Sequence, residues 1–484
     1  GNGTLYNGNG TAWMVKDINT GSDDGNPLYM TAVGNTLYFT ADSIGNLGYE
    51  LWKSDGTASG TVMVKDINNG SDDSHPHRLK AVGNTLYFLA DDGTHGKELW
   101  KSDGTASGTV MVKDINNGSA SGISTNPGSS TNFEITAVGN TLYFQANDGI
   151  NGGELWKSDG TASGTVMVKD IRSGGWTSYP DELTVFNNTL YFTAAVTNNA
   201  WDLFKTDGTA NGTVMVKNLY GSSAYDAPSH LTTVGNTLYF QADDGTNGDE
   251  LWKSDGTASG TVMFKDINSG SGSSNPVQLT AVGNTLYFGA NDGINGSELW
   301  KSDGTASGTV MVKDIRASYM ASNSLLIRDV IGNTIYFITD DQIHGMELWK
   351  SDGTASGTVM IKDINNGSND GLLGIYTSDG AANTNTFFFS ANDGTNGYEL
   401  WKTDGTAAGT VMVQDICNAS TTPSCQWGSG YGGDAYATFV GNTLYFQAND
   451  GDNGTELWAL DPANIIFNTP PPVSWETDPA LPAG

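Results

Sequence analysis

The stretch Glu98–Ile115, ELWKSDGTASGTVMVKDI, recurs along the whole chain and decides how it folds. Near-identical copies occupy Glu154–Ile171, Glu250–Ile267, Glu298–Ile315 and Glu347–Ile364, and looser copies lie between and beyond them. Self-similarity at a fixed period is the signature of a repeat architecture. The chain is therefore read as one array of equivalent units.

One aromatic residue anchors each copy, and these anchors measure the period. They are Trp52, Trp100, Trp156, Phe204, Trp252, Trp300, Trp349, Trp401 and Trp458. Successive gaps are 48, 56, 48, 48, 48, 49, 52 and 57 residues, so each unit holds about 48 residues. We expect one repeat domain over residues 1–461, followed by a tail over residues 462–484 in which Pro470, Pro471 and Pro472 favour extended, polyproline-like backbone.

A complete unit divides into four short apolar runs separated by Gly, Asn and Asp. In the second unit these runs are Leu79–Val82, Thr85–Ala90, Glu98–Lys101 and Thr109–Ile115. Runs of this length between turn residues are typical of strands, and their Tyr, Phe, Trp, Val and Thr suit a pleated surface. Four antiparallel strands repeated around a ring describe the blades of a β-propeller. The sequence predicts an all-β fold without α-helix.

The number of strands predicts how the ring closes. The third-strand motif occurs nine times, and the outer-strand motif also occurs nine times, but its first copy, Trp13–Ile18, precedes any complete unit. We therefore expect nine four-stranded blades, with the N-terminal strand completing the blade that contains Trp458. Adjacent strand residues such as Leu99 and Trp100 point to opposite faces, and both are expected to be buried against neighbouring blades. Eight blades or an open spiral are the alternatives.

Charge restricts the partners of this protein. The 484 residues carry 22 Lys and Arg against 53 Asp and Glu, a net charge of −31. Binding to nucleic acid or to an anionic membrane needs a basic surface, so both partners are disfavoured. No apolar run is long enough to span a bilayer, so no membrane insertion is expected. Cations and extracellular glycans fit this charge better.

The start of the chain and its two cysteines favour export. The sequence begins at Gly1 without a signal-peptide pattern, as expected for a mature chain whose leader has been removed. Cys417 and Cys425 lie close together in one Gly- and Ser-rich insertion, which predicts a local disulfide formed in an oxidising compartment. Two unbonded thiols are the alternative. We expect an extracellular or cell-surface location.

The loop between the second and third strands is a candidate calcium site. In the second unit it reads DDGTHGKE, Asp91–Glu98, and other units follow the form [DN]-D-G-x-N-G-x-E. Carboxylate and amide oxygens spaced by glycines are the hard ligands that Ca²⁺ takes. The candidate ligands are Asp92, Glu98, Asp148, Glu154, Asp244, Glu250, Asp292, Glu298, Asp393, Glu399, Asp450 and Glu456.

Two structural alternatives compete with calcium at this loop. Asp-Gly and Asn-Gly are ordinary turn residues that need no metal. Glu98 also falls close to Lys113 across the intervening turn, which predicts a cross-strand ion pair. His75 and His77 could chelate a metal, and a solvated loop is the alternative for them.

Catalytic signals are weak in this sequence. The five histidines form no known nucleophile or metalloprotease motif. Carboxylates from different blades could meet at the ring axis, as in propeller glycosidases. Near-identity of the units argues against this, because an active site needs residues that differ from blade to blade.

The motif ELWKSDGTASGT, Glu98–Thr109, resembles that of the bacterial ELWxxDGT-repeat proteins. The resemblance extends from about Thr11 to Leu460 and implies a secreted or surface-anchored propeller of an environmental bacterium. It implies no activity, because that family has no catalytic motif to transfer. The Ser-Asp-Gly-Thr turn is also similar to the Asp-box turn of sialidase propellers, which is a structural feature.

These observations lead to a functional hypothesis of a non-enzymatic, extracellular structural or adhesive protein that self-associates, for example into a filament or layer. Both ends carry a version of the same hairpin, and the residues expected to mediate assembly are Leu5, Tyr6, Ile465, Ile466 and Phe467. A glycan-binding propeller is the alternative, with stacking platforms at Trp176, Tyr179, Trp427 and Tyr431. A polysaccharide-degrading enzyme is the third hypothesis.

Overall fold

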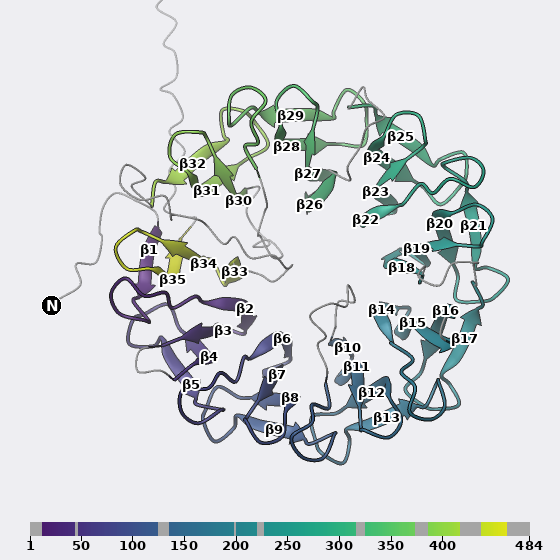
Figure 1. The fold of residues 1–484 in the computed structure, drawn as a ribbon. Coiled ribbons are helices and arrows are strands. Elements are labelled where there is room, and N and C mark those ends of the chain that lie inside the picture. The colour runs from purple at the N-terminus through teal and green to yellow at the C-terminus, as the bar shows by residue number, and fades with distance from the viewer. Residues whose placement is uncertain are drawn as a thin grey trace, which may run out of the picture.

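The fold is a ring of nine antiparallel sheets, seen in a computed structural model of the chain (Figure 1). The structure describes residues 12–43, 47–123, 135–197, 200–219, 227–315, 325–372, 386–416 and 437–461. Every regular element in these ranges is a strand. Eight sheets have four strands, and the eighth along the chain has three among the described residues. The predicted nine-bladed, all-β propeller is confirmed.

Each blade runs outward from the ring axis through its strands in chain order. The inner strands are β2 (Leu28–Val33), β6 (His77–Val82), β10 (Thr136–Val138), β14 (Asp181–Phe186), β18 (Ser229–Val234), β22 (Val277–Val282), β26 (Leu326–Ile331) and β33 (Ala437–Val440). The second strands are β3 (Thr36–Asp42), β7 (Thr85–Asp91), β11 (Thr141–Asn147), β15 (Thr189–Thr197), β19 (Thr237–Asp243), β23 (Thr285–Asn291), β27 (Thr334–Asp340), β30 (Phe387–Asn392) and β34 (Thr443–Asn449). The third strands are β4 (Tyr49–Ser54), β8 (Lys97–Ser102), β12 (Gly153–Ser158), β16 (Ala200–Thr206), β20 (Asp249–Ser254), β24 (Ser297–Ser302), β28 (Met346–Ser351), β31 (Tyr398–Thr403) and β35 (Thr455–Leu460). The outer strands are β5 (Val62–Lys65), β9 (Val110–Lys113), β13 (Val166–Lys169), β17 (Val214–Lys217), β21 (Val262–Lys265), β25 (Val310–Lys313), β29 (Val359–Lys362), β32 (Val411–Gln414) and β1 (Ala12–Lys16).

The ring is closed by the N-terminal strand. Strand β1 pairs antiparallel with β35, with Met14 opposite Trp458, and so supplies the outer strand of blade nine. This confirms the closure predicted from the order of the motifs. Blades one to eight are numbered here from β2 along the chain.

The core is distributed over the interfaces between blades. In blade two, Leu86, Phe88 and Trp100 pack against blade one, whereas Tyr87 and Leu99 pack against blade three. Leu99 is fully buried and Trp100 is 5% exposed, so both faces of the third strand are covered, as predicted. Because each sheet buries its faces only against its neighbours, an open end would expose apolar surface.

The Ser-Asp-Gly-Thr turn joins neighbouring blades as well as two strands. Asp103 accepts hydrogen bonds from the backbone N–H and the hydroxyl of Thr105, which shapes the turn. Lys53 of blade one donates to the carbonyl of Gly104 at 2.8 Å. The hydroxyl of Tyr38 lies against the same glycine. The preceding blade packs on this turn, which explains why the SDGT motif recurs along the chain.

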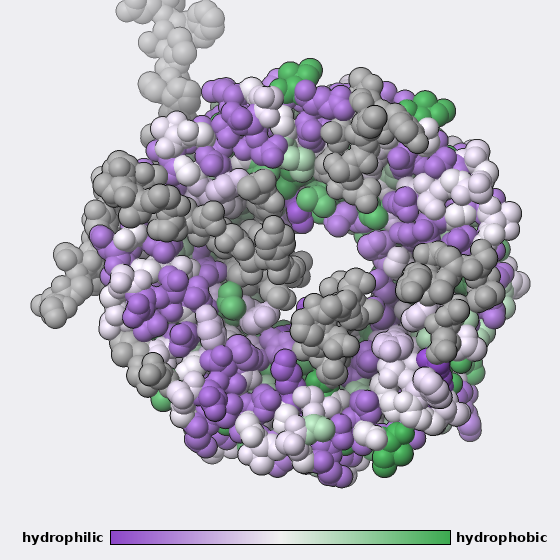
Figure 2. Space-filling model, viewed as in Figure 1, coloured by the Kyte–Doolittle hydropathy of each residue, from purple (hydrophilic) through white to green (hydrophobic). Residues whose placement is uncertain are grey.

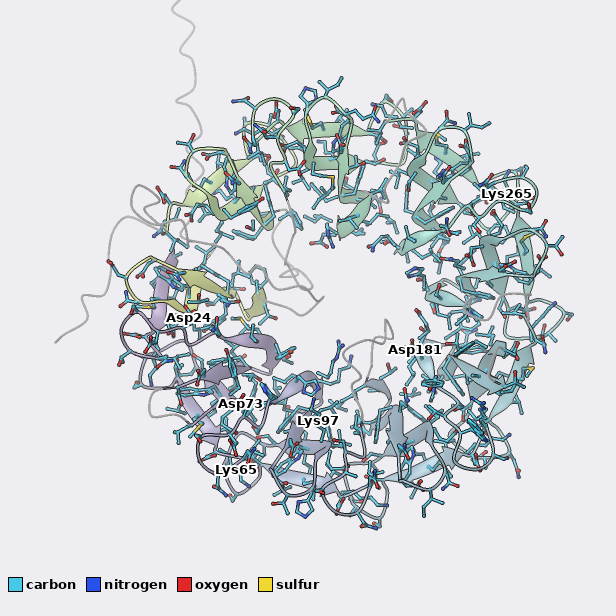
Figure 3. All side chains as sticks on the ribbon, in the orientation of Figure 1. Asp24, Lys65, Asp73, Lys97, Asp181 and Lys265 are labelled. Carbon is cyan, nitrogen blue, oxygen red and sulfur yellow. The ribbon has the colours of Figure 1, made fainter. Side chains whose placement is uncertain are left out.

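The outer edge of the ring carries a second joint. Lys65 donates to the carbonyl of Thr109 in the next blade at 2.8 Å, and its ammonium lies 5.7 Å from the centre of the Trp100 ring. A cation over an aromatic face contributes roughly 0.5–1 kcal/mol at an exposed site. Lys65 and its counterpart Lys265 both lie at this outer edge (Figure 3).

The visible face of the ring is largely hydrophilic and has an opening at its centre (Figure 2). Among the described residues, a helix with the length and apolar character needed to cross a bilayer does not occur.

We predict that Gly104→Ala destabilises the protein more than Gly83→Ala. Both glycines have positive φ, +87° and +59°, but a Cβ at Gly83 would meet no atom within 4 Å, whereas one at Gly104 would collide with the Tyr38 hydroxyl. The left-handed backbone costs about 1–2 kcal/mol for alanine at either site. Displacing Tyr38 should add about 1–3 kcal/mol at Gly104 alone. Urea denaturation of both variants measures the difference, and equal midpoints would show that this joint is not tightly packed.

Candidate functional site

The blades are nearly identical, so positions that differ between blades and lie close together are the candidates for a site. Such positions begin the inner strands. The first of them holds Leu28, His77, Asp181, Ser229 and Val277 in blades one, two, four, five and six. The next holds Tyr29, Arg78, Glu182, His230 and Gln278. Asp181 lies on the inner side of the ring (Figure 3).

The second of these variable positions has an unusual backbone. Tyr29, Arg78, Glu182, His230 and Gln278 all have φ between 55° and 59°, in the left-handed region. The register of each inner strand shifts there, for example between His77 and Lys80 in β6. A non-glycine residue in this conformation is strained by roughly 1–3 kcal/mol, and such strain is concentrated at functional sites.

A cavity of about 440 Å³ lies at this level between blades one and two. It is lined by Leu28, Tyr29, Thr40, Tyr49, His75, His77 and Lys97. The lining combines apolar and aromatic walls with a few polar groups, which is typical of small-molecule sites.

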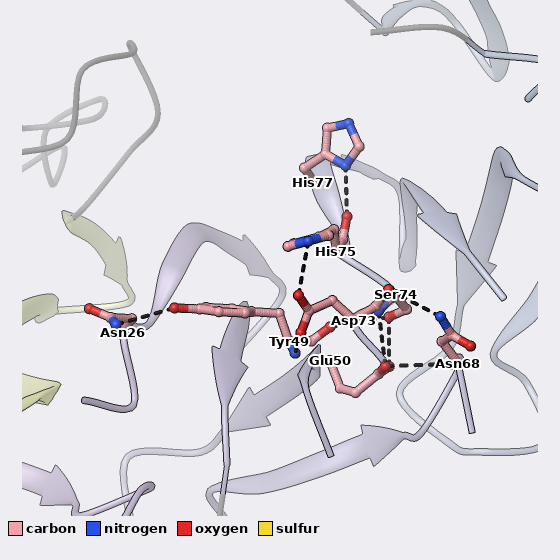
Figure 4. Close-up of polar contacts among 8 residues, drawn as sticks. All are labelled: Asn26, Tyr49, Glu50, Asn68, Asp73, Ser74, His75 and His77. Atoms are coloured by element: carbon pink, nitrogen blue, oxygen red, sulfur yellow. Dashed lines mark hydrogen bonds and ion pairs between the residues drawn. The ribbon is translucent and has the colours of Figure 1, made fainter. Parts of the chain in front are cut away.

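Polar contacts and ring stacking orient the two histidines and one tyrosine of the cavity (Figure 4). His75 Nε2 lies 3.1 Å from a carboxylate oxygen of Asp73, whose other oxygen accepts the backbone N–H of Tyr49 at 2.8 Å. The Tyr49 hydroxyl accepts from the Asn26 side chain at 3.2 Å. The Tyr49 ring is stacked on the His75 ring, with centroids 5.8 Å apart and planes inclined by 19°.

His77 is held as a neutral imidazole. Burial, together with the nearby charges of Lys97 and Arg78, lowers the pKa of His77 to about 4. A carbonyl oxygen only accepts, so the contact of 2.7 Å between His77 Nδ1 and the His75 carbonyl places the ring proton on Nδ1. His77 Nε2 therefore presents a lone pair, as a fixed hydrogen-bond acceptor.

The side chains that line the cavity include a lysine and no carboxylate. No Asp or Glu is among its lining residues, whereas Lys97 and two histidines are. Lys97 lies on blade two, well inside the outer edge occupied by Lys65 (Figure 3). Carboxylates lie just outside this lining, because Asp73 contacts His75 at 3.1 Å and the charges of Asp42, Asp73 and Asp24 act on Tyr49.

Comparison of the blades shows that this lining is particular to blade two. The residue equivalent to Lys97 is Gly153, Trp201, Asp249, Ser297 and Met346 in blades three to seven. The residue equivalent to His75 is Asn26, Tyr179 and Asn275 in blades one, four and six, each with positive φ. The interpretation of Ser74–His77 as a solvated loop is corrected for His77, because this residue begins β6 and lines the cavity. Alignment of the inner-strand starts would have shown the difference.

The predicted calcium ligands are not brought together by the fold. Asp92 Oδ1 accepts the backbone N–H groups of Thr94 and His95, and Oδ2 contacts the His95 ring at 2.8 Å. The same closed turn, with an Asn side chain in place of His95, is formed at Asp148, Asp244, Asp292, Asp393 and Asp450.

The glutamates of the motif are buried elsewhere, where they hold the linkers between blades. Glu98 is fully buried and accepts the backbone N–H groups of Ile115, Asn116 and Gly122 at 3.2, 3.4 and 2.8 Å. Linker N–H groups are likewise accepted by Glu154, Glu250, Glu298, Glu399 and Glu456. Among the described residues, no three His, Cys, Asp or Glu side chains are grouped as metal ligands.

The expected ion pair between Glu98 and Lys113 is not formed. Lys113 donates to the carbonyl of Thr165 in blade three at 2.8 Å and lies 5.6 Å from the centre of the Trp156 ring. In the sheet, Lys113 is opposite Leu99 rather than Glu98, so its side chain leaves the blade toward the next one.

Burial gives these glutamates unusual acidity. It raises the pKa of Glu98 to about 7, against the lowering effect of the three backbone N–H groups. Burial also raises the pKa of Glu50, Glu154, Glu250 and Glu347 to about 7 and that of Glu456 to about 8.

Several predicted residues lie outside the described part of the chain. These are Cys417, Cys425, Leu5, Tyr6, Ile465, Ile466, Phe467, Trp427 and Tyr431. The disulfide, self-association, glycan contacts and extracellular location stay predictions. Two of the candidate platforms for glycan stacking are described. Trp176 is 61% exposed, and the Arg172 guanidinium lies over its ring. The centroids of the Tyr179 and Trp201 rings lie 6.4 Å apart.

Comparison with known proteins adds only fold-level likeness. No family model and no curated protein matches the chain, so the resemblance to ELWxxDGT-repeat proteins stays a prediction. The computationally designed Ika8 protein is similar over 92% of this chain and 99% of its own, at 13% identity and a TM-score of 0.42. A puromycin hydrolase mutant is similar over 88% of this chain and 59% of its own, at 12% identity and a TM-score of 0.41. Oligopeptidase B from Leishmania major is similar over 80% of this chain and 53% of its own, at 12% identity and a TM-score of 0.39.

This comparison corrects the functional hypothesis of a non-enzymatic structural or adhesive protein. Two of these similar proteins are named as a hydrolase and a peptidase. The chain spans little more than half the length of these two enzymes, 59% and 53%. The likeness extends to the fold alone and assigns no reaction to this chain.

We predict that stability falls as pH rises from about 5 to 8. The folded pKa of Glu98, about 7, lies above its ordinary value of 4.5, so the folded state binds more protons than the unfolded state between these values. The resulting stabilisation is complete below pH 4.5 and is lost as pH rises through about 7. Glu98→Gln, which cannot ionise, should reduce the decline measured by urea denaturation at several pH values.

Asp103→Asn is the matched control for this experiment. Hydrogen bonds from Thr105 lower the pKa of Asp103 below its ordinary value of 3.8, so it does not titrate between pH 5 and 8. If the free energy of unfolding declined equally with pH in Glu98→Gln and in the parent protein, Glu98 would not be a source of the decline.

Calcium binding by the loops stays a prediction with its own test. If calcium binds the folded loops, the melting temperature should rise with free Ca²⁺ by mass action and fall with a chelator. Substituting Asp92, Asp148 and Asp244 together by Asn should reduce that response. An unchanged melting temperature in chelator would favour the alternative that these loops are ordinary turns without bound metal.

Proposed function

We propose that this protein binds a small organic carboxylate in the cavity between blades one and two. The observation that carries the proposal is the lining itself, which includes Lys97, His75 and His77 but no carboxylate, in a chain of net charge −31. Lys97 is the group of the lining that can attract a carboxylate, and it has to do so against the repulsion of the acidic surface around it.

The size and rigidity of the cavity support a small ligand. Its volume of about 440 Å³ lies within the range of roughly 300–1,000 Å³ that is usual for small-molecule sites. Tyr49 is fixed by Asn26 at its hydroxyl and by His75 at its ring face. His75 is fixed in turn by Asp73. A wall held in place in this way loses little conformational entropy when a ligand binds.

Each lining group has a distinct part in the proposed binding. Lys97 supplies a point charge for the carboxylate. Leu28 and the rings of Tyr29 and Tyr49 contact the carbon skeleton. His77 and Thr40 contribute oriented polar atoms. The neutral imidazole of His77 and the tyrosine hydroxyls can also act as general acids or bases. The carboxylate should therefore be analysed for chemical conversion after binding.

We predict that Lys97→Met weakens carboxylate binding by about tenfold or more, because a charged hydrogen bond contributes about 1.5–3 kcal/mol. Methionine is chosen because Met346 occupies the equivalent position of blade seven, so the fold accommodates it. Isothermal titration at low ionic strength, with a panel of aliphatic, aromatic and hydroxylated carboxylates, measures the effect. Analysis of the ligand after incubation detects turnover.

Ser297→Ala changes the equivalent position of blade six, away from the cavity, and is the matched control. It should bind every ligand as the parent protein does. The proposal fails if no carboxylate of the panel binds, or if Lys97→Met binds as tightly as the parent protein.

A further inference from the structure

His77 and its neighbours define the chemistry of the ligand beyond its charge. The cavity offers hydrogen-bonding atoms whose roles are fixed by bonds they already make. These donor and acceptor roles decide which neutral groups the ligand carries beside its carboxylate. The inference rests on the proposed function, because it assumes that a carboxylate binds in this cavity.

Two of these atoms are acceptors. His77 Nδ1 donates to the His75 carbonyl at 2.7 Å, so Nε2 can only accept while the ring is neutral. Thr40 uses its hydroxyl hydrogen on the Pro76 carbonyl, which leaves lone pairs on its oxygen. Both atoms call for a hydrogen-bond donor on the ligand.

A third atom is a donor. The Tyr49 hydroxyl accepts from Asn26 at 3.2 Å and therefore directs its own hydrogen elsewhere. Burial raises the pKa of Tyr49 above its ordinary value of 10.0, so this hydrogen is retained at neutral pH. The cavity thus combines acceptors, a donor and a lysine within one volume.

Among neutral groups, a hydroxyl satisfies both kinds of partner because it donates and accepts. An ammonium group would also donate, but the positive charges of Lys97 and Arg78 that act on His77 disfavour a second cation there. The tyrosine rings suit the face of a sugar ring or chain better than a purely polar wall would.

We infer that the ligand of this cavity is a polyhydroxy carboxylate of the sugar-acid class, and that His77 is the residue that selects its hydroxyl groups. Lys97 binds the carboxylate, Tyr49 donates to one hydroxyl oxygen, and His77 Nε2 accepts from a hydroxyl hydrogen. A carboxylate without hydroxyls makes none of these hydrogen bonds in the cavity, which is the physical origin of the selection.

The test compares gluconate with hexanoate, which have the same number of carbons and the same charge, by isothermal titration of the full chain. Gluconate should bind at least about tenfold more tightly, as expected when hexanoate loses more than one hydrogen bond to the cavity. The ratio should be the same at pH 5.5 and pH 8, because His77 stays neutral well above its pKa of about 4.

His77→Val is the diagnostic variant, and Val277 at the equivalent position of blade six shows that the fold accepts it. It should abolish most of the preference for gluconate, measured as the ratio of the gluconate affinity to the hexanoate affinity. A merely structural role of His77 would instead weaken both ligands together. Val277→Ala, at the equivalent site of another blade, is the control and should keep the preference.

The outcomes separate this inference from the proposed function. If hexanoate binds as tightly as gluconate and Lys97→Met weakens both, carboxylate binding stands and the sugar-acid assignment is overturned. If N-acetylglycine matches gluconate, an amide N–H serves as the donor and the assignment is again overturned. If no carboxylate binds, the proposed function itself fails.

Discussion

Every blade of this protein buries its two faces only against neighbouring blades, and the rest of the structure depends on that constraint. The core consists of clusters between blades, such as the one that joins Phe88 and Trp100 of blade two to Leu51 of blade one. A single sheet could not remain folded with both faces exposed. The pairing of β1 with β35 is therefore required, because it removes the open ends of the array.

The repeated motif is explained by joints between blades rather than by a repeated binding site. Lys53 and Tyr38 of blade one contact Gly104 of blade two. Lys65 of blade one donates a hydrogen bond to Thr109 of blade two. Buried Glu98 accepts hydrogen bonds from the linker that leads to blade three. Each joint needs the same residues in every blade because the same geometry recurs. The motif is therefore the same in nearly all blades because it stabilises the contacts between them. A functional site is expected at positions where the blades differ.

The cavity between blades one and two lies at such a place. The inner strands begin with strained residues whose identities change from blade to blade, and only blade two combines His75, His77 and Lys97 there among the described blades. The sequence pattern suggested a metal site for His75 and His77 and did not connect them with Lys97, because His77 and Lys97 are 20 positions apart and lie on different strands. It also assigned Asp92 and Glu98 to one site, although the first closes its own turn and the second is buried under a linker.

The sequence by itself determined the all-β architecture, the nine blades and the closing strand, because period, turn residues and strand alternation are local and repeat along the chain. The prediction of four strands around Trp100 needed only neighbours within one unit. Tertiary structure alone decided which polar residues meet. Glu98 could pair with Lys113, a metal or the backbone, and packing chose the backbone because its side chain faces the buried linker. His77 acquired its neutral state in the same way, from burial and from the nearby charges of Lys97 and Arg78.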